Sequence, residues 1–266
     1  MRGLWLTLLA VPLVVWAQTA TTPSPYKQLV DKIQLNIVTV RAVVKAEFKA
    51  GDESESRESK FTLQGAVLTS DGLVMLPGVL LSSESFKQYY GIDDDDRVDI
   101  KLTPLSFKVI FGSETKEYEA RLVATDSQLG LAFLKITDLE GRTVQAIPMN
   151  EEPLTLGSEV VVVSRLPRGY DYAPYYCTGR VISEVSKPRK AYLLEGSISE
   201  MGLPVYNRNG EMVGVMVELR HGLKDEEVDI GFRENFGSDD GTRFLVPVSA
   251  IRPLIEQARQ RASATQ

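Results

Sequence analysis

The sequence predicts an all-β protein. After residue 36, most of the chain consists of short segments rich in valine, isoleucine, leucine and phenylalanine, separated by turn-forming residues about every 8–12 positions. Two of the separators, Ser70-Asp71-Gly72 and Asn207-Arg208-Asn209-Gly210, are typical of β-hairpin turns. This pattern favours a β-sandwich or a β-barrel. A chain of 266 residues can form one large or two small domains with a sizeable core.

Composition and charge narrow the possible functions. Hydrophobic residues make up 43% of the chain and charged residues 25%, as is ordinary for a folded soluble protein. The net charge of −6 argues against a nucleic-acid partner. The single cysteine, Cys177, allows no internal disulfide, and the single histidine, His221, excludes a histidine-rich metal site. We therefore expect neither a cofactor nor a bound metal.

The first 17 residues have the features of a secretory signal peptide. Arg2 supplies a positive charge, Leu4 to Val15 is apolar, and Ala17 ends a plausible cleavage site. The apolar run is short for a transmembrane helix, so we expect a secreted or periplasmic protein without a stable membrane span after cleavage. An uncleaved N-terminal anchor is the alternative. Residues 18–36 are expected to form a leader and a short helix, since Leu29, Val30 and Ile33 share one helical face.

The remaining segments are expected in a simple order. An N-terminal β-domain covers residues 37–145, a C-terminal β-domain covers 146–250, and a helix and tail follow over 251–266. The predicted strand regions are Ile37–Phe48, Phe61–Leu81, Leu105–Ile136, Leu154–Ser164, Cys177–Val185, Leu203–Val217 and Phe244–Val248. We expect polar loops over Ala50–Lys60, Ser82–Thr103 and Arg220–Gly241.

The loop over 82–103 contains four consecutive aspartates, Asp93 to Asp96. A calcium-binding loop of the EF-hand type alternates its carboxylates and has a central glycine, and this run does neither. A solvated acidic loop is the better interpretation.

One stretch carries a resemblance to a known family. Residues 195–217 read E-G-S-I-S-E-M-G-L-P-V-Y-N-R-N-G-E-M-V-G-V-M-V, which resembles the nucleophile loop of chymotrypsin-fold serine peptidases, G-N-S-G-G-P-L, followed by a hairpin of the type V-N-x-x-G-x-V-I-G. Seven positions match that frame: Gly202, Pro204, Val205, Asn207, Gly210, Val213 and Gly214. Met201 stands where the family has its nucleophilic serine.

Two further segments resemble the HtrA/Deg type of this family. Phe61 to Leu81 is similar to G-S-G-V-I-I-S-x-D-G-Y-I-L-T-N-x-H-V-V, and it places the general-base histidine position at Val79, or at Gly78 if one residue is skipped. Leu105 to Ile136 ends like V-x-x-D-x-x-x-D-I-A-V-L-K-I, with Gly130 at the triad aspartate and Asp126 at the earlier, non-catalytic aspartate. The resemblance implies two six-stranded antiparallel β-barrels with a cleft between them. The PDZ domain common in the HtrA/Deg type has no counterpart in the sequence.

The resemblance implies a peptidase without its catalytic groups. The mechanism needs a hydroxyl, an imidazole and a carboxylate, and the matching positions hold Met201, Val79 and Gly130. Ser199, where the family has glycine, also narrows the dihedral angles open to the oxyanion-hole loop. We therefore predict an inactive pseudopeptidase that binds a polypeptide or protein partner, in an oligomeric state that the sequence leaves open.

The candidate binding residues are polar or aromatic: Ser199, Glu200, Tyr170, Tyr172, Tyr175 and Tyr176. Tyrosines provide rigid amphipathic contact area, but these rings could equally cover one end of a barrel. Two other hypotheses stay open. One is an active serine-type hydrolase with relocated residues, drawn from Ser197, Ser199, Cys177 and His221. The other is a structural component of an envelope or extracellular assembly.

Overall fold

The computed structural model describes residues 24–50, 53–90, 92, 98–187, 189–219, 237–238 and 241–264. The predicted signal peptide, the four-aspartate run and His221 lie outside these residues. Among the helices in these ranges, none is both long enough and apolar enough to cross a membrane.

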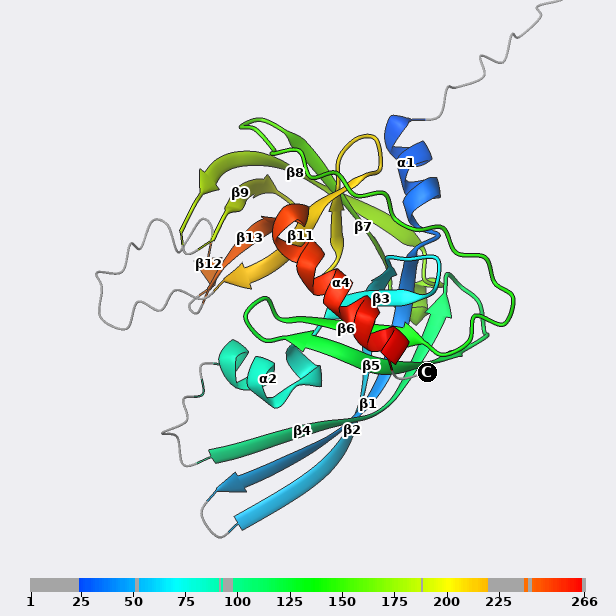
Figure 1. The fold of residues 1–266 in the computed structure, drawn as a ribbon, viewed down its shortest axis with the longest axis vertical. Helices are drawn as coiled ribbons and strands as arrows, with labels where there is room; N and C mark the ends of the chain where they lie inside the picture. The colour runs from blue at the N-terminus through cyan, green and yellow to red at the C-terminus, as the bar shows by residue number, and fades with distance from the viewer. Residues whose placement is uncertain are drawn as a thin grey trace, which may run out of the picture.

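The first half of the chain forms a closed antiparallel β-barrel (Figure 1). Its six strands, in their order around the barrel, are β1 (Ile37–Ala50), β2 (Glu53–Val67), β3 (Leu73–Pro77), β6 (Leu131–Ile136), β5 (Tyr118–Asp126) and β4 (Val98–Phe111). The predicted turn at Ser70-Asp71-Gly72 joins β2 to β3, and Gly72 has a φ of +87°. β6 is buried along its whole length, because its neighbours on both sides and the second barrel all pack against it.

The second half forms another six-stranded ring. Its strands are β11 (Met212–Leu219), β10 (Pro204–Tyr206), β7 (Glu159–Arg165), β8 (Pro174–Val185), β9 (Ala191–Gly196) and β13 (Gly241–Pro247), and pairing of β13 with β11 closes the ring. The short β12 (Gly237–Ser238) adds to the outer side of β13. The predicted double barrel is therefore confirmed.

Helices pack around the barrels, and the last one crosses both of them (Figure 1). They are α1 (Pro25–Ile33), the 3-10 turn η1 (Val79–Leu81), α2 (Ser83–Tyr90), the 3-10 turn η2 (Arg168–Tyr170) and α4 (Val248–Ala264). In α1 the predicted apolar face, Leu29, Val30 and Ile33, is buried. α4 begins at Val248, three residues before the predicted start.

Two loop predictions were wrong. Residues 53–60 belong to β2, which pairs with β1 from Ala50↔Glu53 to Ile37↔Ala66. The prediction failed because charge and serine content suggested a loop, whereas strand pairing leaves these side chains in solvent and so tolerates them. In the predicted acidic loop, residues 83–90 form α2 and residues 98–103 form the start of β4.

β1, β2 and β4 extend beyond the barrel as a three-stranded arm, made of residues 43–50, 53–60 and 98–106 (Figure 1). β1 is the central strand of the arm and β2 is its outer edge. Among the described residues, β2 pairs with β3 only at Ala66 and Val67. The second edge of β2 therefore has no strand neighbour over residues 54–64 in the described structure.

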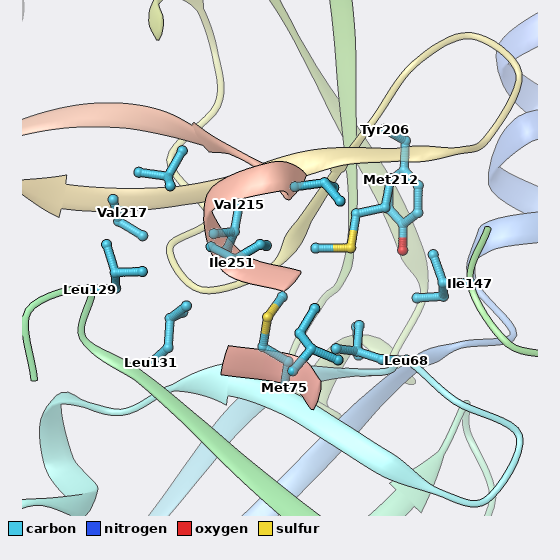
Figure 2. Packing of buried hydrophobic residues seen from close by; sticks show 14 of the residues in the cluster. Leu68, Met75, Leu129, Leu131, Ile147, Tyr206, Met212, Val215, Val217 and Ile251 are labelled. Carbon is cyan, nitrogen blue, oxygen red and sulfur yellow. The ribbon is translucent and has the colours of Figure 1, made fainter. Parts of the chain in front are cut away.

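The two barrels meet through one apolar core. Figure 2 shows Leu68, Met75, Leu129 and Leu131 of the first barrel facing residues of the second barrel and of α4. The facing side chains in that view are Tyr206, Met212, Val215, Val217 and Ile251. Because this shared core is apolar and buried, burial of apolar surface keeps the barrels in one relative orientation.

A buried arginine connects the N-terminal segment to the second barrel. The Arg165 side chain donates hydrogen bonds to the carbonyl oxygens of Ile37 (3.1 Å), Tyr172 (3.0 Å) and Gln34 (2.7 Å). Burial lowers the pKa of its guanidinium. Arg165 therefore ties the junction of α1 and β1 to the turn between β7 and β8.

Candidate functional site

A pocket of about 280 Å³ lies where the two barrels meet. The first barrel contributes residues from β2, the end of β3, η1 and the β5–β6 turn, and the second contributes the loop before β10 and the end of β11. Its lining residues are Leu63, Pro77, Val79, Leu80, Leu129, Gly130, Met201, Gly202, Met216, Val217 and Glu218. The three positions at which the family resemblance places the catalytic triad therefore line one pocket.

The geometry separates the two candidates for the general-base position. At Gly78 an added Cβ would lie 2.6 Å from the carbonyl carbon of Leu131, so no side chain fits there. The Gly78 N–H also donates a 2.7 Å hydrogen bond to the carbonyl oxygen of Gly130. Val79, the next residue, has its side chain at the pocket, so of the two candidate positions only 79 can present a side chain there.

Gly130 lies directly opposite Val79. It has a φ of +60°, and a Cβ added there would lie 3.6 Å from Val79 Cγ2. A side chain at 130 would therefore contact a side chain at 79, as an orienting carboxylate must contact its base. Asp126 does not take over this place, because its Oδ1 accepts a 2.8 Å hydrogen bond from the Leu129 N–H and caps the turn.

Met201 lies in the loop that leads into the β10–β11 hairpin. The predicted hairpin is confirmed, with Val205 paired to Gly214 and a β-bulge after Val205. Gly202 has a φ of +73°, and an added Cβ would lie 2.6 Å from the Pro77 nitrogen. This close approach presses the loop against β3 and holds the half-buried Met201 at the pocket.

Glu200 connects this loop to β8. Its Oε1 accepts hydrogen bonds from the Tyr175 hydroxyl (3.0 Å) and the Cys177 thiol (3.4 Å), and its Oε2 accepts one from the Ser199 N–H (2.9 Å). The Ser199 N–H, which the family resemblance places among the backbone donors of the oxyanion hole, is thus bound to a carboxylate of the chain itself. Ser199 is exposed, and the positive-φ residues of this loop are Gly196 and Gly202 instead.

The Cys177 thiol is a poor nucleophile in this setting. Burial raises its pKa, and the Glu200 carboxylate raises it further, so the reactive thiolate is disfavoured. Cys177 is half-buried, and its thiol is hydrogen-bonded to Glu200. Ser197, also considered as a nucleophile, hydrogen-bonds the thiol through its side chain.

The four candidate tyrosines do not form one surface. Tyr170 in η2 is 68% exposed, whereas Tyr172 is buried. Tyr175 and Tyr176 belong to β8 and not to a loop. The Tyr176 ring stacks on Tyr26 of α1 at a centroid distance of 5.1 Å. Packing against the chain itself thus accounts for Tyr172 and for part of Tyr176.

Sequence reasoning did not find the Glu200 network or most of the pocket lining. Tyr175 and Cys177 are two positions apart on one strand, so their side chains lie on the same face of the sheet. The two-residue repeat of a strand could therefore have predicted that these two side chains are neighbours. Leu129, Met216 and Glu218 carry no motif, and only the approach of the two barrels brings them together. In the described ranges, no group of three or more His, Cys, Asp or Glu residues is placed to hold a metal ion.

Comparison with known proteins agrees with this architecture. A search of curated proteins found no match. A scan against protein families matched the trypsin-like peptidase domain to residues 64–215, which is more than half of the chain. The matched region runs from β2 to the middle of β11 and includes all three pocket positions, Val79, Gly130 and Met201. The chain belongs to the trypsin-like peptidase domain family.

Proposed function

We propose that this chain is a secreted pseudopeptidase, which binds a polypeptide in the former catalytic cleft without cleaving it. The observation that carries the proposal is the composition of the pocket at Val79, Gly130 and Met201. None of the described lining residues has a hydroxyl, thiol or imidazole group, and Glu218 is the one that ionises. Covalent hydrolysis needs an activated nucleophile next to a base, and none of the described lining residues carries a hydroxyl or thiol to act as that nucleophile.

The nearby polar groups do not restore this chemistry. The Cys177 thiol and the Ser199 N–H are both hydrogen-bonded to the Glu200 carboxylate. An anion held at the Ser199 N–H occupies the donor that would otherwise stabilise a developing oxyanion. The hypothesis of relocated catalysis depends on His221, which lies outside the described residues.

Binding is supported by a strand edge beside the pocket. β10 pairs with β11 up to Val215, and the Gly202 N–H then bonds the Met216 carbonyl at 2.9 Å. Over residues 217–219, β11 is paired with β13 on one side and, among the described residues, with no strand on the other. An extended polypeptide can add there by backbone hydrogen bonds. An apolar side chain of that polypeptide would fill the pocket beside Val79 and Met201.

The first test asks whether the protein is a hydrolase. The unmodified protein and the Met201→Ser variant are incubated with a fluorophosphonate probe, and hydrolysis of unfolded casein is measured alongside. We expect no labelling and no cleavage by the unmodified protein, because none of the described residues that line the pocket has a hydroxyl group. Labelling of the unmodified protein would refute the proposal, and mapping the labelled residue would identify the nucleophile.

The second test asks whether the pocket binds polypeptide. Fluorescent peptides from unfolded casein are titrated with the protein, and binding is followed by fluorescence anisotropy. Met201→Lys places an ammonium group in the apolar pocket and should weaken binding roughly tenfold or more, because an apolar side chain of the polypeptide would have to strip water from that charge. Leu156→Lys, at a side chain that is 70% exposed and does not line the pocket, is the matched control. Equal binding by both variants would exclude the pocket as the binding site.

A further inference from the structure

The free edge of β2 has the charge pattern of a self-complementary strand. Residues 54–64 read S-E-S-R-E-S-K-F-T-L-Q, and their second edge has no strand neighbour in the described structure. Glu58 and Lys60 are exposed, and no ion pair between described residues includes either of them. On β1, by contrast, the cations Arg41 and Lys45 are each paired with a carboxylate. Exposed edge strands pair readily with another strand unless something opposes it.

We propose that two copies of this chain associate through β2, edge to edge and antiparallel, with the two-fold axis at Ser59. When a two-fold axis perpendicular to the sheet relates the two strands, residues that lie opposite one another point their side chains to the same face of the sheet, because side chains alternate between the two faces along each strand. Centring the axis on Ser59 uses the whole free edge, since residue 54 then lies opposite residue 64 of the second copy. The result is a continuous six-stranded sheet formed by the two arms.

This register brings opposite charges together. Glu58 lies opposite the second copy's Lys60, and symmetry repeats that pair on the other side of the axis. Arg57 lies opposite the second copy's Phe61, an arrangement that allows a cation–π contact. Ser56 lies opposite Thr62, a hydrogen-bonding pair. Over the whole free edge, no residue lies opposite a like charge, so the cross-strand pairs favour association.

The arm makes this edge accessible. β2 forms the outer edge of the arm in Figure 1, with β1 between it and β4. The other edge of the arm is less suited to pairing. Pro104 in β4 has no N–H to donate, and a β-bulge leaves Leu105 of β4 without a partner on β1. The proposed surface shares only Leu63 with the described pocket lining, and the proposal does not depend on the proposed function.

The first experiment measures the monomer–dimer equilibrium of the purified protein by sedimentation velocity over a wide range of concentration. We expect a reversible dimer. Glu58→Lys and Lys60→Glu should each raise the dissociation constant roughly tenfold or more, since symmetry places each like-charge pair in the dimer twice. The double exchange restores opposite charges and should return the constant towards that of the native protein. Lys49→Glu, on β1 of the same arm, is the matched control.

The second experiment tests the register. Cysteines opposite one another in an antiparallel pair are close enough for a disulfide. Under mild oxidation, Ser59→Cys should cross-link two copies and Ser56→Cys should not, with the unmodified protein showing the background from Cys177. A monomer at every concentration would overturn the proposal and would mean that the edge charges keep the strand single. The proposal would also be overturned by a dimer whose dissociation constant is unaffected by the Glu58 and Lys60 substitutions, or by a dimer that cross-links through position 56.

Discussion

Replacement of Arg165 by methionine should strongly destabilise the protein. The guanidinium donates to three backbone carbonyl oxygens, at 2.7–3.1 Å, and the side chain is 8% exposed. A hydrogen bond from a charged donor contributes roughly 1.5–3 kcal/mol. Methionine keeps much of the volume and removes the cost of burying a charge, which offsets part of the loss. We therefore expect the free energy of unfolding to fall by about 3–5 kcal/mol.

Equilibrium urea unfolding, followed by tyrosine fluorescence and circular dichroism together, measures this change. Arg168→Met is the matched control, because Arg168 is exposed on the turn between the same two strands, and its cost should stay within about 0.5 kcal/mol. Arg165→Lys should lie between the two, since one ammonium cannot reach all three carbonyls in the guanidinium geometry. A loss below about 1 kcal/mol for Arg165→Met would refute the assigned role, because even one lost charged hydrogen bond should exceed it.

Three further predictions concern the loop at the pocket and the surface of the second barrel. Gly202→Ala should lower the melting temperature more than Gly141→Ala, because both glycines have a positive φ but only Gly202 lacks room for a Cβ. Equal decreases in melting temperature would contradict the close contact between Gly202 and Pro77. Cys177 should react slowly with iodoacetamide at neutral pH, and it should react faster in the Glu200→Gln variant, because loss of the carboxylate charge lowers the thiol pKa. If the pH dependence of the alkylation rate is the same in both proteins, Glu200 does not raise the thiol pKa. Glu159→Gln should lower the free energy of unfolding by up to about 1 kcal/mol at neutral pH, because hydrogen bonds from Arg208 and Tyr26 hold the Glu159 pKa below its usual value. This difference should shrink as the pH falls through the pKa of the unfolded state and vanish below the folded-state pKa; urea unfolding at several pH values tests this, and a difference that persists in acid would contradict it.

Local patterns predicted much of the double barrel. Turn residues at Ser70-Asp71-Gly72 and Asn207-Gly210 marked two hairpins that the structure contains, because these turns require residues that tolerate unusual dihedral angles. The apolar spacing in α1 marked the face that is buried. The charged start of β2 was misassigned, since an exposed strand in the arm has no apolar alternation to reveal it.

The sequence predicted individual residues of the candidate site but not that they lie together. Matching motifs pointed to Val79, Gly130 and Met201 from three segments distant in sequence, and the structure shows that these residues line one pocket. The choice between Gly78 and Val79 required coordinates, because it depends on how closely Gly78 approaches Leu131.

The sequence by itself determined most of the strands and turns, since these follow from neighbours a few residues apart, and it gave the residue types at the positions that the family resemblance assigns to the triad. Only the tertiary structure decided what those residues face. The packing of the two barrels forms the apolar pocket. The loop before β10 lies against β8 and places Glu200 beside Tyr175 and Cys177, and three carbonyls from separate segments converge on Arg165. Such contacts join residues far apart in the chain, so they arise from how the barrels pack and not from any local pattern.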